Sequence, residues 1–155
     1  MVSCRNAFCS WWRRQNANVM AVLLASLVWG GGYLAFFDSN HPHVLESEVR
    51  GEDGKPKAHF RAGDTLYVYR HWCIDRVVSG DVDVEILHVE SGQFYYLGTR
   101  AAGAKIGCSR RTSANKLPLH LPTGHYEFRS KVTYPVNPLR TIVFETPILI
   151  FEIVP

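Results

Sequence analysis

The stretch His125-Tyr-Glu-Phe-Arg-Ser-Lys-Val-Thr-Tyr134 alternates cleanly between apolar and polar side chains. The apolar positions are Tyr126, Phe128, Val132 and Tyr134. The charged positions between them are Glu127, Arg129 and Lys131. Because successive side chains of a strand point to opposite faces, this period of two predicts a β-strand with one face in a core and the other in water.

Further short alternating segments lie on both sides of this strand. They are residues 44–49, 65–71, 82–88, 94–97, 117–121, 142–144 and 148–153. Turns containing glycine separate several of them, at residues 51–56, 62–64, 79–80 and 91–92. In residues 117–121 the prolines indicate an edge strand, since proline cannot donate to a ladder. About seven such strands, with no helix among them, predict a mainly β fold, an antiparallel β-sandwich.

Residues 19–37, VMAVLLASLVWGGGYLAFF, contain no charged side chain. At a rise of 1.5 Å per residue, a helix of this length covers roughly 28 Å, close to the hydrocarbon thickness of a bilayer. Arg5, Arg13 and Arg14 precede the run, and acidic residues follow it. The positive-inside rule then places the N-terminus in the cytoplasm and the rest of the chain across the membrane. A cleaved signal peptide and a buried soluble helix are the competing interpretations.

The membrane interpretation divides the chain into four parts. Residues 1–18 are a basic cytoplasmic tail, 19–37 a single transmembrane helix, 38–43 a linker and 44–155 an exported domain. The predicted location is the bacterial inner membrane, with the lipid bilayer as a partner and the domain in the periplasm. Small residues four apart, as at Ala21 and Ala25, permit close helix packing, so a homo-oligomer is one expected assembly. The formal net charge of +3 comes from the tail, which argues against a nucleic-acid partner.

The predicted span separates the four cysteines into two pairs. Cys4 and Cys9 lie on the cytoplasmic side, where thiols stay reduced, and Cys73 and Cys108 lie on the exported side. Because the periplasm is oxidising, we expect a disulfide between Cys73 and Cys108. Two buried free thiols are the alternative.

The turn Leu121-Pro-Thr-Gly-His-Tyr126 resembles the turn into strand F of immunoglobulin-like and fibronectin-like domains. The resemblance implies an immunoglobulin-like sandwich with a tyrosine corner, in which the Tyr126 hydroxyl bonds back to the backbone of the turn. Pro122 would stiffen the entry, and Gly124 would allow the tight bend. Phe128 stands where an antibody domain has its second cysteine, so the expected disulfide lies elsewhere.

Four motifs extend the comparison along the chain: Arg61-Ala-Gly-Asp-Thr65, Arg70-His-Trp-Cys-Ile-Asp-Arg76, the turn at 121–126, and Tyr134-Pro-Val-Asn-Pro-Leu139. Together they resemble small single-pass membrane proteins of tailed bacteriophages and proteobacteria, with an immunoglobulin-like exported domain. In that group a Cys often precedes the Asn-Pro, whereas this chain has Val136. The resemblance implies residence in a bacterial inner membrane, that of the host cell if the protein is phage-encoded, and it implies no reaction.

The sequence lacks the patterns that carry catalysis or bind metals. The seven histidines have no metal-ligand spacing, so we expect solvated histidines, no metal and no cofactor. Neither a G-x-S-x-G elbow nor a phosphate loop is present. Asp81, Asp83 and Glu85 line one strand face, as solvated acids commonly do. The sequence therefore favours a protein that is not an enzyme, with an envelope hydrolase as the alternative.

Six aromatic residues gather around two predicted strands: Tyr67, Tyr69, Trp72, Phe94, Tyr95 and Tyr96. Because neighbours in a strand alternate, one face cannot hold all of them, and those that are exposed are expected to contact a partner. The competing interpretation is that they fill the core and cover its edge. We therefore expect a membrane-anchored, non-catalytic binding or structural module that contacts another envelope protein. The alternative is a periplasmic metal-handling or assembly factor for a membrane complex.

Overall fold

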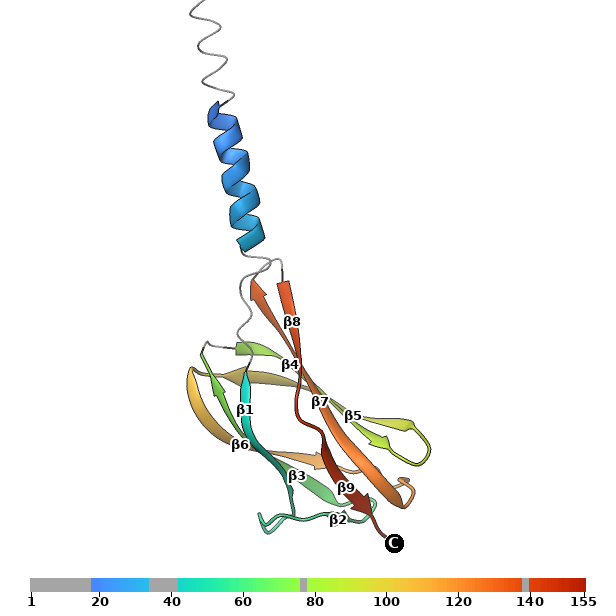
Figure 1. The fold of residues 1–155 in the computed structure, drawn as a ribbon. Helices are drawn as coiled ribbons and strands as arrows, with labels where there is room; N and C mark the ends of the chain where they lie inside the picture. The colour runs from blue at the N-terminus through green and yellow to red at the C-terminus, as the bar shows by residue number, and fades with distance from the viewer. Residues whose placement is uncertain (1–17, 34–41, 76–77, 138–139) are drawn as a thin grey trace, which may run out of the picture. The chain divides into compact units, whose positions relative to one another are not determined.

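The computed structural model describes residues 18–33, 42–75, 78–137 and 140–155 (Figure 1). The chain divides into two units, Met1–Ser39 and Asn40–Pro155. Several predicted features fall outside the described residues. They are the cytoplasmic tail up to residue 17 with Cys4 and Cys9, the end of the span at 34–37 and the linker residues 38–41.

The first unit contains a helix over residues 18–33. Its apolar side chains are largely exposed, among them Leu27 and Trp29. Of the residues that the structure describes, none belongs to a helix long and apolar enough to cross a membrane. The transmembrane helix over residues 19–37 therefore stays a prediction.

The second unit is built from strands, nine of which lie in its described part. They are β1 His43–Arg50, β2 His59–Phe60, β3 Thr65–Ile74, β4 Val78–His88, β5 Gln93–Ala104, β6 Gly107–Lys116, β7 Gly124–Asn137, β8 Arg140–Glu145 and β9 Leu149–Ile153. A three-stranded sheet has the order β1-β3-β6, and a six-stranded sheet has the order β2-β9-β7-β4-β5 with β8 paired to β7 (Figure 1). The short pairing of β2 with β9 is parallel, and the other pairings are antiparallel.

The core contains apolar side chains from both sheets. In the three-stranded sheet Leu66 and Val68 of β3 are buried, and in the six-stranded sheet Val84 and Ile86 of β4 are buried. The inward positions predicted for β7 are confirmed, because each is at most 2% exposed: Tyr126, Phe128, Val132 and Tyr134. The alternation of β7 therefore identifies its buried face correctly, and the prediction of a mainly β fold is confirmed.

Strand β6 is absent from the segments that the sequence predicts. Its sequence, GCSRRTSANK, has few apolar residues, and only Asn115 is buried. It forms because all ten of its residues pair with β3, from Thr65 opposite Lys116 to Ile74 opposite Gly107. Pairing with a neighbour, rather than a pattern of its own, makes this segment a strand.

The prediction of an edge strand at residues 117–121 was wrong, because this segment is a loop. Leu117 and Leu121 are buried, whereas Leu119 between them is 82% exposed. The flanking Pro118 and Pro122 lack the N–H groups that a ladder needs, so the apolar residues reach the core from irregular backbone.

Strand β4 begins earlier than predicted and takes in Ser79 and Gly80, which the sequence suggests as a turn. A Cβ atom at Gly80 would lie 2.1 Å from the Thr133 carbonyl oxygen of β7. The glycine is therefore required by the close approach of two strands rather than by a turn.

The disulfide between Cys73 and Cys108 is confirmed. The two cysteines lie opposite each other on β3 and β6, within one sheet. The bridge thus ties the polar edge strand β6 to its neighbour and does not connect the two sheets.

Candidate binding surface

The six aromatic residues predicted as contacts are divided between the two sheets. Tyr67, Tyr69 and Trp72 are half-buried on β3 of the three-stranded sheet. Arg50 covers Tyr69, with the guanidinium carbon 3.8 Å from the ring centroid. Because the other three rings belong to β5 of the six-stranded sheet, the six do not form one surface.

The three aromatic residues of β5 point in two directions. Tyr95 packs against the core, with its ring centroid 6.4 Å from that of Tyr126. Phe94 and Tyr96 face solvent and are 53% and 62% exposed. Of the six predicted contacts, these two therefore combine exposure with a shared face.

The solvent-facing side of the six-stranded sheet, which we call the outer sheet face, carries these two rings. Its other members come from β4, β7, β8, β9 and the residue before β9: Asp83, Glu85, Glu127, Arg129, Lys131, Glu145, Ile148 and Ile150. The register places Glu85 between Tyr96 and Arg129 and sets Glu127 opposite Ile150. Residues far apart in the sequence thus become neighbours on this face.

Most charged groups of the outer sheet face are paired with one another. Arg129 Nη2 donates to Glu127 Oε2 at 2.6 Å, and its guanidinium carbon lies 5.6 Å from the Phe94 ring centroid. Lys131 Nζ lies 3.5 Å from Glu145 Oε1. The Tyr96 hydroxyl donates to Asp83 Oδ1 at 3.3 Å, beside the Thr99 hydroxyl, which contacts both.

A hollow of about 340 Å³ lies on this face, between β4, β7 and the segment that joins β8 to β9. Tyr96, Arg129 and Ile148 line it together with three acids, Asp83, Glu85 and Glu145. Ser130 and Thr146, both buried, also line it, with their hydroxyl oxygens 2.8 Å apart. Aromatic and aliphatic groups that remain exposed among paired charges suit non-covalent contact rather than bond chemistry.

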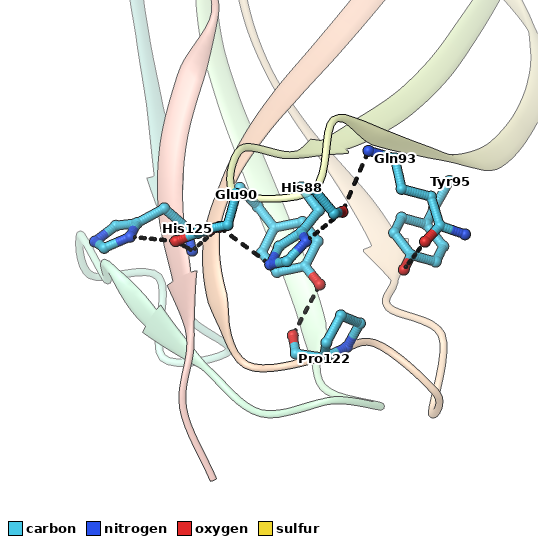
Figure 2. A network of polar contacts seen from close by, with 8 residues as sticks. His88, Glu90, Gln93, Tyr95, Pro122 and His125 are labelled. Carbon is cyan, nitrogen blue, oxygen red and sulfur yellow. Dashed lines mark hydrogen bonds and ion pairs between the residues drawn. The ribbon is translucent and has the colours of Figure 1, made fainter.

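A second cluster surrounds the turn into β7 (Figure 2). The Tyr126 hydroxyl donates to the Pro122 carbonyl oxygen at 2.8 Å, and burial raises the pKa of Tyr126 to about 12. Gly124 adopts a φ of +141°, and a Cβ atom there would lie 2.6 Å from His88 Nε2. The tight packing of the turn against His88 therefore requires glycine at this position.

His88 differs from the expectation of a solvated histidine, because it is 7% exposed. Its ring lies 4.9 Å from the Tyr126 ring, and its Nδ1 lies 2.7 Å from Ser91 Oγ (Figure 2). Its Nε2 is 3.0 Å from Glu90 Oε2, without the alignment of a hydrogen bond.

Ser91, His88 and Glu90 are residue types that occur in hydrolase triads. Here the Ser91 hydroxyl bonds within the turn that joins β4 to β5. Ser91 Oγ accepts a bond from the Gln93 backbone N–H at 3.3 Å, and the aligned carboxylate–imidazole bond that orients a catalytic base is missing from the trio.

Glu90 joins the β4–β5 hairpin to β7. It accepts hydrogen bonds from the His125 backbone N–H at 2.9 Å and from His125 Nδ1 at 2.8 Å. These bonds, from the backbone first and the ring second, lower the pKa of the Glu90 carboxyl to about 2. The same ring bond raises the pKa of His125 above its ordinary value.

This pair predicts a melting temperature that depends on pH. The bonds of Glu90 stabilise the fold above pH 4.5, its ordinary value, and are lost as the pH falls toward about 2. The contribution of His125 is complete below pH 6.5 and is lost as the pH rises through its raised pKa. The difference in melting temperature between the natural chain and Glu90→Gln should therefore be largest between pH 4.5 and 6.5.

Thermal melts across the acid and neutral range check this prediction. His125→Gln is the matched variant, because it keeps the backbone N–H that holds Glu90 and removes only the titrating ring. In His125→Gln the melting temperature should no longer fall through loss of the ring bond as the pH rises above 6.5. It should still fall as the pH drops below 4.5. A melting difference that is flat with pH would contradict the assignment.

Comparison with known proteins finds a similar fold but no matching family. The chain matches no family model and no curated protein. Among solved structures it is similar to the C-terminal domain of Wzt, with 11% identity and a TM-score of 0.53 over 76% of this chain and 75% of that one. It also aligns with a family 123 glycoside hydrolase from Clostridium perfringens, with 13% identity and a TM-score of 0.36 over 70% of this chain and 27% of that one. The first likeness shows a shared fold, and the second is too weak to support an argument.

Proposed function

We propose that this chain is a membrane-anchored, non-catalytic binding module of the bacterial envelope. The proposal rests on the outer sheet face. This face exposes four apolar side chains among charged groups that are largely paired: Phe94, Tyr96, Ile148 and Ile150. Exposed aromatic groups beside an arginine are typical of the residues that dominate protein interfaces. We infer that the partner is another envelope protein.

The strand order supports an immunoglobulin-like description of the domain. One sheet joins β1, β3 and β6, while the other joins β9, β7, β4 and β5 and adds β2 in parallel beside β9. Variable-type immunoglobulin domains extend the sheet of strands G, F and C by strands beside C, as β5 extends this sheet beside β4. In this comparison β7 corresponds to strand F, the strand that carries the tyrosine corner.

Site-specific crosslinking tests the binding surface. A photoreactive phenylalanine at Phe94 or Ile150 in the full chain in native membranes should form an adduct with one envelope protein. The same group at Leu45, which is exposed on β1 of the other sheet, should not. Phe94→Ser should lower recovery of that partner about tenfold or more, as expected for a residue that dominates an interface, with Leu45→Ser as the matched control. Equal adducts from all three positions would refute the surface.

The membrane anchor has its own test. We expect residues 19–37 to remain in the mature protein, because a charge-free run of this length follows three arginines. A reporter that is active only outside the cytoplasm should work when fused after Pro155, and mass spectrometry should find the N-terminal tail retained. A mature N-terminus near residue 38 would identify the segment as a signal peptide.

One observation favours metal handling as the second candidate function. Within the described part of the chain, potential ligand atoms of His71, Cys73 and Cys108 all lie within 4.8 Å of one another. The disulfide withholds both thiolates, so such a site would need reduction first. Binding of Zn²⁺ by the reduced chain, and its loss in His71→Ala, would support this alternative.

A further inference from the structure

A cavity of about 130 Å³ lies between the two sheets, apart from the outer sheet face. Strands β3 and β6 line one side, and β4, β5 and β7 line the other. Its apolar walls include Val68, Val84 and Phe128. Its polar groups are unusual for a space between two sheets, because three of them are guanidinium groups, those of Arg70, Arg100 and Arg111.

Neighbouring groups hold each arginine in place. Arg70 Nη2 donates to Thr146 Oγ1 at 2.8 Å, and Arg111 Nη1 donates to the Gly103 carbonyl oxygen at 2.5 Å. Arg100 donates from Nη2 to Asn115 Oδ1 and from Nη1 to the Ala114 carbonyl oxygen at 3.4 Å. Since a guanidinium group has five N–H donors, these bonds leave donors unused on every arginine.

The three positive charges have no acidic partner in the described part of the chain. The lining residues include no Asp or Glu, and none of the ion pairs there involves Arg70, Arg100 or Arg111. Burial and the charge of Arg100 lower the pKa of Arg70 to about 10. Arg70 and Arg100 are half-buried and Arg111 is exposed. Like charges held together without a counterion repel one another, so a negative charge among them would be favourable.

Trp72 provides an independent sign of a missing acceptor. Its indole lines the same cavity, and its buried Nε1 has no hydrogen-bond partner among the described residues. Indole N–H can only donate, and buried donors are rarely left unpaired. The cavity therefore combines an excess of positive charge with a lining side chain whose buried donor is unpaired.

We infer that this cavity binds a small multivalent oxyanion of the phosphate or sulfate type, held by Arg70, Arg100 and Arg111 beside the indole of Trp72. Oxyanions accept several charge-assisted hydrogen bonds at once, as unused guanidinium donors require. Arg111 is exposed on the edge strand β6, so the site is open to solvent on that side. A purely structural role, in which arginines bridge the strand edges, explains the bonds to Gly103 and Ala114 but leaves the Trp72 donor unpaired.

The indole of Trp72 supplies the test. The full chain is labelled with indole-¹⁵N tryptophan, and the Trp72 resonance is assigned by its loss in Trp72→Phe. Inorganic phosphate and, separately, sulfate are added up to about 10 mM at constant ionic strength, well above a millimolar Kd. We expect a saturable shift of this N–H signal with either anion and none with chloride. Acetate in a third arm separates a multivalent oxyanion from any carboxylate.

Two adjacent residues of β6 give matched variants. Arg111→Gln should weaken binding at least about tenfold, because it removes one charge-assisted contact. Arg110→Gln, which removes an equal charge at a position that does not line the cavity, should leave the affinity unchanged. Arg100→Gln replaces Arg111→Gln if circular dichroism shows that the latter is unfolded. The inference would be overturned if the shift did not saturate or if chloride or acetate reproduced it. It would also be overturned if Arg111→Gln and Arg100→Gln both kept the shift.

Discussion

Replacing Tyr126 with alanine is expected to lower the free energy of unfolding by about 3–5 kcal/mol, the usual cost of truncating a large buried aromatic side chain. The ring is 0% exposed and packs against His88 and Phe151, at centroid distances of 4.9 and 5.5 Å. Its removal leaves a cavity at the turn into β7 and frees the Pro122 carbonyl oxygen. Urea unfolding of the full chain, followed by circular dichroism, measures the loss.

Two further variants separate the ring from its hydroxyl. Tyr126→Phe keeps the packing and removes the bond to Pro122, so we expect a loss of about 0.5–1.5 kcal/mol. Lys131→Ala lies on the same strand, on the outer sheet face, and should change stability by no more than about 0.5 kcal/mol. If Lys131→Ala proved as costly as Tyr126→Ala, the division of β7 into a core face and a solvent face would be wrong.

Removing the disulfide is expected to lower the free energy of unfolding by about 2–5 kcal/mol, the range found for small secreted domains. The two cysteines are separated by 35 residues, for which the chain-entropy model gives about 3.8 kcal/mol. Because β6 is polar and lies at the edge of its sheet, the loss should appear there first. Hydrogen exchange in Cys73→Ser or Cys108→Ser should therefore become faster along β6 and the paired end of β3 than in β7.

Reduction provides the control. A dithiol reductant should destabilise the natural chain by about as much as either substitution and should leave the double variant unchanged. Labelling of both cysteines by an alkylating mass tag in unreduced, unfolded protein would show that the bridge is absent.

The amino-acid sequence by itself determined where the strongest strands lie and which of their faces is buried. In β4 and β7 the period of two is visible because Val84, Ile86, Tyr126 and Phe128 face a core while their neighbours face water. It also predicted the disulfide that the structure contains, because the expected membrane span leaves Cys73 a single possible partner, Cys108, on the same side. Such inferences succeed because local periodicity and cysteine chemistry depend on the chain alone.

Only the tertiary structure decided that residues 107–116 form a strand and that 117–121 do not. The first segment is polar and becomes a strand by pairing with β3, whereas the apolar side chains of the second reach the core from a loop. A pattern of side chains reports burial, and hydrogen bonding to a distant neighbour leaves no such pattern in the segment itself.

The candidate sites depend on the same distant pairing. The aromatic cluster in the sequence is divided by the two sheets, so that Phe94 meets Arg129 and not Tyr69. Likewise Arg70, Arg100 and Arg111 occupy three strands, and in the sequence each is typical of a solvated position. Their convergence on one cavity follows from the register and from the packing of two sheets, which are properties of the folded chain and not of any segment within it.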